Sequence, residues 1–246
     1  MGSIRGLVPL LAIAALAALA ACTGAVPDAP GGSSPAQKQS VSVSPSADAS
    51  SAPAPRTTAS LNPALLAVAD LPPGFTRVPT TASGGTLSSP DPNCATLVMI
   101  LNTPHAIGTL TQVDARFSKG DLGPFIDEQI GALASSTAVA AEQAQLETAV
   151  AGCPQVTLTE PGHASSPMLI HPVNPPSGGE NPVAFRATVS GPGPAGFEFT
   201  QVLAGVGDTV VTVSVVRAQA SEVDGIARAA VDKAARVLKA NRSGAS

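Results

Sequence analysis

The sequence has no tryptophan, no tyrosine and only six phenylalanines among its 246 residues. Flat aromatic side chains that could stack on bases or sugars are therefore scarce. Its 13 Lys and Arg residues are outnumbered by 17 Asp and Glu residues, which gives a formal net charge of −4. Because binding to a phosphate backbone relies on a surplus of basic side chains, the composition argues against a nucleic-acid partner.

Signs of catalytic or metal chemistry are also lacking. None of the three histidines has another histidine, a cysteine or a carboxylate at metal-ligand spacing: His105, His163 and His171. The chain contains no Gly-x-Ser-x-Gly motif of the kind that presents a nucleophilic serine. The sequence therefore predicts no catalytic residue, no metal site and no cofactor, and it does not identify the residues that bind a ligand.

Two other patterns have simple structural interpretations. Residues 191–196 (GPGPAG) match the glycine fingerprint of dinucleotide-binding loops, but that motif must open a helix. Here the two prolines precede the strand-like residues 197–200, so we expect a hairpin loop. Four carboxylates fall on segments with helical periodicity and are interpreted as solvated helix faces: Asp127, Glu128, Glu142 and Glu147.

The N-terminus has the features of an export signal. Arg5 precedes an uncharged, Leu- and Ala-rich stretch over residues 7–21, which is shorter than the ~20 residues of a membrane-spanning helix. The stretch ends in Leu19-Ala20-Ala21-Cys22, which resembles a bacterial lipobox. We predict a lipoprotein signal peptide over residues 1–21 and a diacylglyceryl group on Cys22, with palmitate-type acyl chains. The alternative is an ordinary secretory signal in which Cys22 is incidental.

Two acyl chains are enough for stable anchoring, so we expect the mature chain at the cell membrane, on the outer face of the cytoplasmic membrane.

The residues after Cys22 form a tether. Ser, Ala, Pro, Gly and Thr occupy 29 of the 38 positions from 23 to 60, and Leu, Ile and aromatic residues are absent. Such a segment buries too little apolar surface to offset its ordering entropy, so we expect residues 22–60 to be a disordered linker.

A single α+β domain is predicted over residues 61–240, followed by a disordered tail over 241–246. The expected class is an antiparallel sheet of about five to six strands with flanking helices on one of its faces. Helices are expected at 62–70, 91–101, 122–133, 137–150 and 221–238. Strands are expected at 108–118, 155–159, 167–172, 182–189, 197–204 and 209–216, with a short extended piece after Phe75.

If Cys22 carries lipid, Cys94 and Cys153 are the two cysteines that remain. In an exported chain such a pair is expected to form a disulfide, here closing a loop of about 60 residues worth roughly 4 kcal/mol. Free thiols are the alternative. A redox pair is disfavoured because there is no Cys-x-x-Cys spacing.

These features occur together in a known group of proteins. The chain resembles exported actinobacterial lipoproteins in four features. These are the lipobox, the Ser/Pro/Ala tether, the stretch from Leu65 through Asp70-Leu71-Pro72-Pro73-Gly74-Phe75, and one cysteine in a helix with a second just after a helix. Over about residues 61–240 the chain resembles the extracellular sensor domain of the PknH-type mycobacterial kinase. The resemblance implies an antiparallel sheet flanked by helices, a ligand-accepting cleft and no catalytic residue. That domain has two disulfides, whereas this chain can form one.

The leading hypothesis is a membrane-anchored, non-enzymatic sensor or ligand-binding domain of the cell envelope. Its expected partners are the membrane, through the lipidated cysteine, and a small-molecule, lipid or cell-wall ligand. Three alternatives remain open: a lipid or glycolipid carrier with an apolar cavity, an accessory subunit bound to an envelope protein partner, and an envelope hydrolase.

Overall fold

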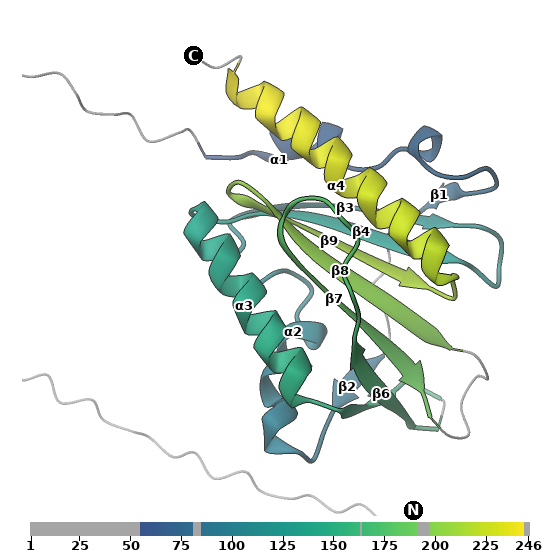
Figure 1. Cartoon of the computed structure of the whole chain (residues 1–246). Helices are drawn as coiled ribbons and strands as arrows, with labels where there is room; N and C mark the ends of the chain where they lie inside the picture. The colour runs from purple at the N-terminus through teal and green to yellow at the C-terminus, as the bar shows by residue number, and fades with distance from the viewer. Residues whose placement is uncertain (1–54, 81–84, 163, 191–196, 244–246) are drawn as a thin grey trace, which may run out of the picture. The chain divides into compact units, whose positions relative to one another are not determined.

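The computed structural model describes residues 55–80, 85–162, 164–190 and 197–243 (Figure 1). The predicted signal peptide, Cys22 and most of the predicted tether lie outside the described residues, as do the glycine-rich loop at 191–196 and His163. None of the helices in the described part has the length and hydrophobicity that a bilayer crossing requires.

The core of the domain is one antiparallel sheet. Its nine strands are β1 Thr76–Val78, β2 Thr86–Ser88, β3 Thr111–Ser118, β4 Phe125–Ala132, β5 Gln155–Thr159, β6 Ser166–Pro172, β7 Glu180–Val189, β8 Glu198–Val206 and β9 Thr209–Val216. They follow the order β1-β3-β4-β9-β8-β7-β6-β5-β2. Four long strands at the centre, β4, β9, β8 and β7, pair over most of their length.

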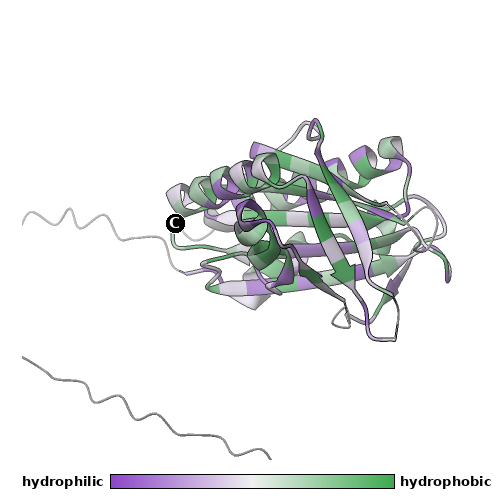
Figure 2. Cartoon of the chain, turned by 90° about the horizontal axis from the view of Figure 1, so that it is seen from below, coloured by the Kyte–Doolittle hydropathy of each residue, from purple (hydrophilic) through white to green (hydrophobic). Residues whose placement is uncertain are grey.

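The α-helices are α1 Thr58–Leu61, α2 Ala95–Asn102, α3 Ser136–Gly152 and α4 Ala220–Ser243, with 3-10 turns η1 Asn62–Ala64, η2 Val68–Asp70 and η3 Pro92–Cys94. In Figure 1, α4 crosses the part of the sheet formed by β3, β4, β9 and β8, while α3 lies beside α2. Hydrophilic and hydrophobic residues alternate along the strands (Figure 2), as expected for a sheet with distinct faces.

The two long helices pack on opposite faces of this sheet. On β8, Ala204 lies in the hydrophobic cluster that contains α4, whereas its neighbour Leu203 lies in the cluster that contains α3. Successive side chains of a strand point to opposite faces, so the two helices must lie on different sides. A Cβ on Gly205 would lie 3.0 Å from Val139 of α3, which shows how closely that helix approaches. The expectation that the helices share one face was therefore wrong.

The prediction of a helix at 122–133 was also wrong, because this segment is strand β4. Its inward row is Ile126, Glu128, Ile130 and Ala132, all almost completely buried. A glutamate in the middle of the row hides the period-two pattern, and the apolar residues that remain mimic a helical spacing. With β4, β1 and the short strand β2 added to the six expected strands, the sheet has nine. The α+β class and the antiparallel pairing are confirmed.

The domain begins earlier than expected. Thr57 caps α1, since its hydroxyl accepts a hydrogen bond from the Ser60 N–H at 3.2 Å and the Ser60 hydroxyl accepts one from Thr57 N–H at 2.9 Å. The predicted helix at 62–70 is instead two 3-10 turns, because the extended backbone of Leu65 and Ala67 interrupts it. At the other end, α4 continues to Ser243, past the expected boundary at 240.

Candidate functional site

The two cysteines of the domain are joined. Cys94 and Cys153 form a disulfide with Cα atoms 4.6 Å apart, and both residues are fully buried. The bond connects the turn before α2 to the residue that follows α3. It holds the α2–α3 pair together against β5 and β6 as a structural element, in the pairing that the sequence indicates.

The two histidines in the described part of the chain do not form a site. His105 and His171 are both exposed, on the loop after α2 and on β6 respectively. Across the described ranges, no three His, Cys, Asp or Glu side chains lie where they could hold one metal ion.

A polar surface lies on the sheet beside α3. Because α3 packs mainly on β6, β7 and β8, the same face of β3, β4 and part of β9 is not covered by it. Most of the polar side chains on this face are half-buried, whereas Asp114 is exposed and Ser118 is buried. We call this set the polar face: Gln112, Asp114, Arg116, Asp127, Gln129, Gln201, Thr212 and Ser214.

Strand register places the members of the polar face in rows. Arg116 lies opposite Asp127, which lies opposite Ser214, which lies opposite Gln201. Directly opposed Cβ atoms are about 5 Å apart, so one row presents four polar groups at regular spacing. Arg116 and Asp127 form a salt bridge, which leaves the row close to neutral. Such a row of hydroxyl, amide and paired charged groups can hydrogen-bond an extended polar ligand.

An apolar row borders the polar one. Phe125 lies opposite Val216, which lies opposite Phe199, and all three are half-buried. The ring of Phe199 meets the ring of Phe185 edge-on, with centroids 5.8 Å apart. A ligand on the polar face would therefore find hydrogen-bonding groups next to accessible apolar surface, the usual combination in small-molecule sites.

A separate groove of about 710 Å³ lies between the start of α2 and the outer face of α3. Small and neutral polar residues line it, including Asn93, Thr96, Gln145 and Thr148. Large apolar side chains, which would hold an acyl chain, are missing from this lining.

Glu128 is a carboxyl group in the hydrophobic core. Its residue is 0% exposed, and Oε2 accepts a hydrogen bond from the backbone N–H of Leu66 at 2.7 Å. Among the described residues no group bonds to the other oxygen, Oε1. Burial raises the pKa of Glu128 to about 7, against the opposing effect of the Leu66 hydrogen bond.

Glu142 is the second buried carboxyl group and belongs to α3. Its residue is 8% exposed, and desolvation raises its pKa to about 7 although the backbone N–H of Ile107 donates to it. The next residue, Gln143, donates through Nε2 to the carbonyls of Glu180 and Asn181, where the β7 register shifts. The helix thus buries two polar side chains, Gln143 against β7 and Glu142 against the loop that contains Ile107.

The interpretation of all four carboxylates as solvated helix faces was therefore wrong for Glu128 and Glu142. Glu147 is exposed on α3 as expected, and Asp127 is half-buried on a strand. Alternation of the inward residues 126, 130 and 132 was the signal that could have placed Glu128 inside. For Glu142, no sequence signal separates it from Glu147, because its burial depends on the loop that contains Ile107.

Comparison with known proteins places the fold. The chain matches no family model and no curated protein sequence. Among solved structures it is similar to the crystal structure of the extracellular domain of PknH from Mycobacterium tuberculosis, with a TM-score of 0.58 and 16% sequence identity. The match covers 74% of this chain and 98% of that one. At this identity the likeness concerns the fold, so the expectation of a PknH-like fold is confirmed.

Proposed function

We propose that this protein is a membrane-anchored lipoprotein whose domain binds a ligand of the cell envelope and acts as a sensor rather than as an enzyme. The polar face carries this proposal. It is a part of the sheet that α3 does not cover, on which half-buried hydroxyl, amide and paired charged groups lie beside an apolar row. This arrangement suits reversible binding, and it brings together no nucleophile, base and orienting group.

The similarity to the extracellular domain of PknH supports the same role, because that protein is a neighbour with an extracellular domain of this fold. The groove between α2 and α3 does not favour the lipid-carrier alternative, since its lining is polar and small. An envelope ligand with hydroxyl and amide groups, such as a cell-wall fragment, fits the polar face better than an acyl chain does.

Binding is tested with the mature chain carrying Cys22→Ser, which removes the acylation site. Soluble peptidoglycan fragments are titrated into isotopically labelled protein, and amide chemical shifts are mapped. We expect chemical-shift changes on β3, β4 and β9. The affinity for the fragment should fall at least tenfold in Gln129→Ala or Gln201→Ala. The matched control is Gln145→Ala in the α2–α3 groove, which should bind normally. Shifts confined to that groove, or none with any fragment, would contradict the proposal.

Anchoring is a separate part of the proposal and has a separate test. We expect the mature protein to begin at Cys22 with a thioether-linked diacylglyceryl group, and to partition with membranes. Intact-mass measurement of the mature chain checks both the cleavage site and the added mass. The Cys22→Ser chain should be released into the soluble fraction. An unmodified Cys22 thiol in the mature protein would refute the anchor without affecting the ligand-binding proposal.

A further inference from the structure

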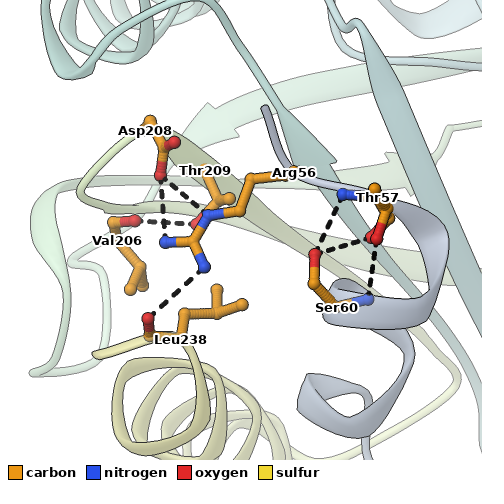
Figure 3. Close-up of polar contacts among 7 residues, drawn as sticks. All are labelled: Arg56, Thr57, Ser60, Val206, Asp208, Thr209 and Leu238. Atoms are coloured by element: carbon orange, nitrogen blue, oxygen red, sulfur yellow. Dashed lines mark hydrogen bonds and ion pairs between the residues drawn. The ribbon is translucent and has the colours of Figure 1, made fainter. Parts of the chain in front are cut away.

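Residues 56–71, which we call the N-terminal strap, lie where the predicted tether joins the domain. Arg56 holds the first end (Figure 3): Nε and Nη2 donate to Asp208 Oδ1 at 3.3 and 3.2 Å, and Nη1 donates to the carbonyl of Leu238 at 3.3 Å. The strap is therefore fastened both to the β8–β9 turn and to the last turns of α4.

The middle of the strap completes the hydrophobic core on the α4 side. Leu61, Ala64, Leu65 and Leu66 are at most 4% exposed and belong to the same cluster as the inward residues of β3, β4 and α4. The turn η1 lies against α4. Without the strap, this part of α4 and β4 would present apolar surface to water.

Glu128 lies directly beneath the strap. The strap supplies its observed hydrogen-bond donor, the Leu66 N–H, while the second carboxylate oxygen is buried without a hydrogen-bond partner among the described residues. An unpartnered oxygen in a dry site is tolerated when the group is neutral and becomes costly when it is charged. Once the strap leaves, water reaches both oxygens, so the ionised carboxylate is stabilised only in the released state.

The surrounding charges only partly offset this effect. Lys233 of α4 and Arg77 of β1 favour the ionised form of Glu128, whereas Asp70 of the strap opposes it. On the strands that flank β4, the residues opposite Glu128 are Ala115 and Val213, which carry no charge. Asp70 also bonds to Lys233 at 2.6 Å, and this bond lowers the pKa of Asp70, so the strap's second fastening persists as the pH falls toward 5.

We infer that the strap is a releasable segment whose docking is controlled by the protonation of Glu128: it is held when Glu128 is protonated and loosened when Glu128 is ionised. Because the burial of Glu128 raises its pKa to about 7, the change falls in the neutral range. Release adds about 16 residues to the tether, which extends its reach by up to roughly 50 Å. It also uncovers the apolar surface of α4. The inference needs neither a ligand nor the lipid anchor.

Hydrogen exchange of the mature Cys22→Ser chain tests the inference, with rates divided by the intrinsic rate at each pH. The amides of Leu61, Leu65 and Leu66 report on the strap, since each is hydrogen-bonded in the docked state. The pKa of Glu128 is near 7 when the strap is docked and near 4.5 when it is released. The protection of the strap amides should therefore fall by roughly fiftyfold to a hundredfold between pH 5 and pH 8. The amide of Val213, in the central sheet, should stay more protected than the strap throughout.

In Glu128→Gln the strap amides should lose most of this pH dependence, with less than a threefold change. Glu142→Gln is the matched control, because it removes a buried carboxyl group of similar pKa elsewhere in the fold. Its strap amides should respond as in the unmodified domain. The inference is overturned if the strap exchanges only together with Val213, a result that needs no variant, or if Glu128→Gln keeps the full pH response.

Discussion

The substitution Glu142→Gln should make the domain less sensitive to pH. Glu142 is almost completely buried on α3, and desolvation raises its pKa from 4.5 to about 7. The folded state therefore holds this proton more tightly than the unfolded state does. The resulting stabilisation is complete below pH 4.5 and is lost as the pH rises through 7.

The size of the effect follows from the shift. A difference of about 2.5 pH units between the two states, at about 1.4 kcal/mol each, amounts to about 3.5 kcal/mol of unfolding free energy in full, of which about 3 kcal/mol is lost between pH 4.5 and pH 8. Glu128 adds a loss of similar size and the same sign. Glutamine keeps an oxygen that can accept from the Ile107 N–H and has no charge to bury. The variant should thus lose about 3 kcal/mol less than the parent across this range.

Urea denaturation at pH 4.5, 6, 7 and 8 measures the difference. The two stability profiles should diverge as the pH rises, with Glu142→Gln the more stable protein at pH 8. Glu147→Gln is the matched control, because Glu147 is exposed on the same helix; its profile should run parallel to that of the parent. Parallel profiles for Glu142→Gln and the parent from pH 4.5 to 8 would refute the reasoning.

Three further perturbations have defined outcomes. Replacing both Cys94 and Cys153 by alanine opens a loop of 59 residues and should lower the unfolding free energy by about 4 kcal/mol, measured by urea denaturation under oxidising conditions; an unchanged midpoint would contradict this. Arg56→Ala removes a partly buried salt bridge and should lower the unfolding free energy by about 2 kcal/mol in the same assay; an unchanged unfolding free energy would contradict this. Gly179 has φ +69, and Gly179→Ala places a Cβ 2.9 Å from a side chain and 3.0 Å from a backbone oxygen. The unfolding free energy, measured by thermal unfolding, should fall by about 3 kcal/mol. Gly162→Ala, with φ +79 and open space around it, should lose only about 1 kcal/mol; equal losses would contradict the steric argument.

The opposed helices explain why this fold has surface to spare for binding. Each long helix covers about half of a nine-stranded sheet, α4 on one face and α3 on the other. The central strands β8 and β9 contact both helices, whereas β3 and β4 pack in the α4 cluster on one face and are not covered by α3 on the other. On β4 this places Glu128 in the core under the strap, and its neighbour Asp127 on the polar face. The two features come from one strand and its alternation.

Much of the secondary structure could be predicted from the sequence. Strands β5 and β9 were predicted at their observed bounds, because alternating β-branched residues between turn signals leave little ambiguity. Helix α3 was placed within two residues at each end, and the last helix was recognised from its amphipathic spacing. The pairing of Cys94 with Cys153 needed only the count of cysteines and the export signal. All of these depend on local pattern or on composition.

The features that only the tertiary structure could show depend on contacts between distant segments. The polar face exists because register aligns residues of β3, β4, β9 and β8, and no local pattern records register across strands. The burial of Glu128 depends on a strap more than 50 residues earlier in the chain, and that of Glu142 on the loop around Ile107. The sequence by itself determined which residues form most of the helices and strands, and which two cysteines form the disulfide. Which carboxylates meet water and which are buried was decided only by packing, because desolvation is a property of the folded surroundings and not of the residue.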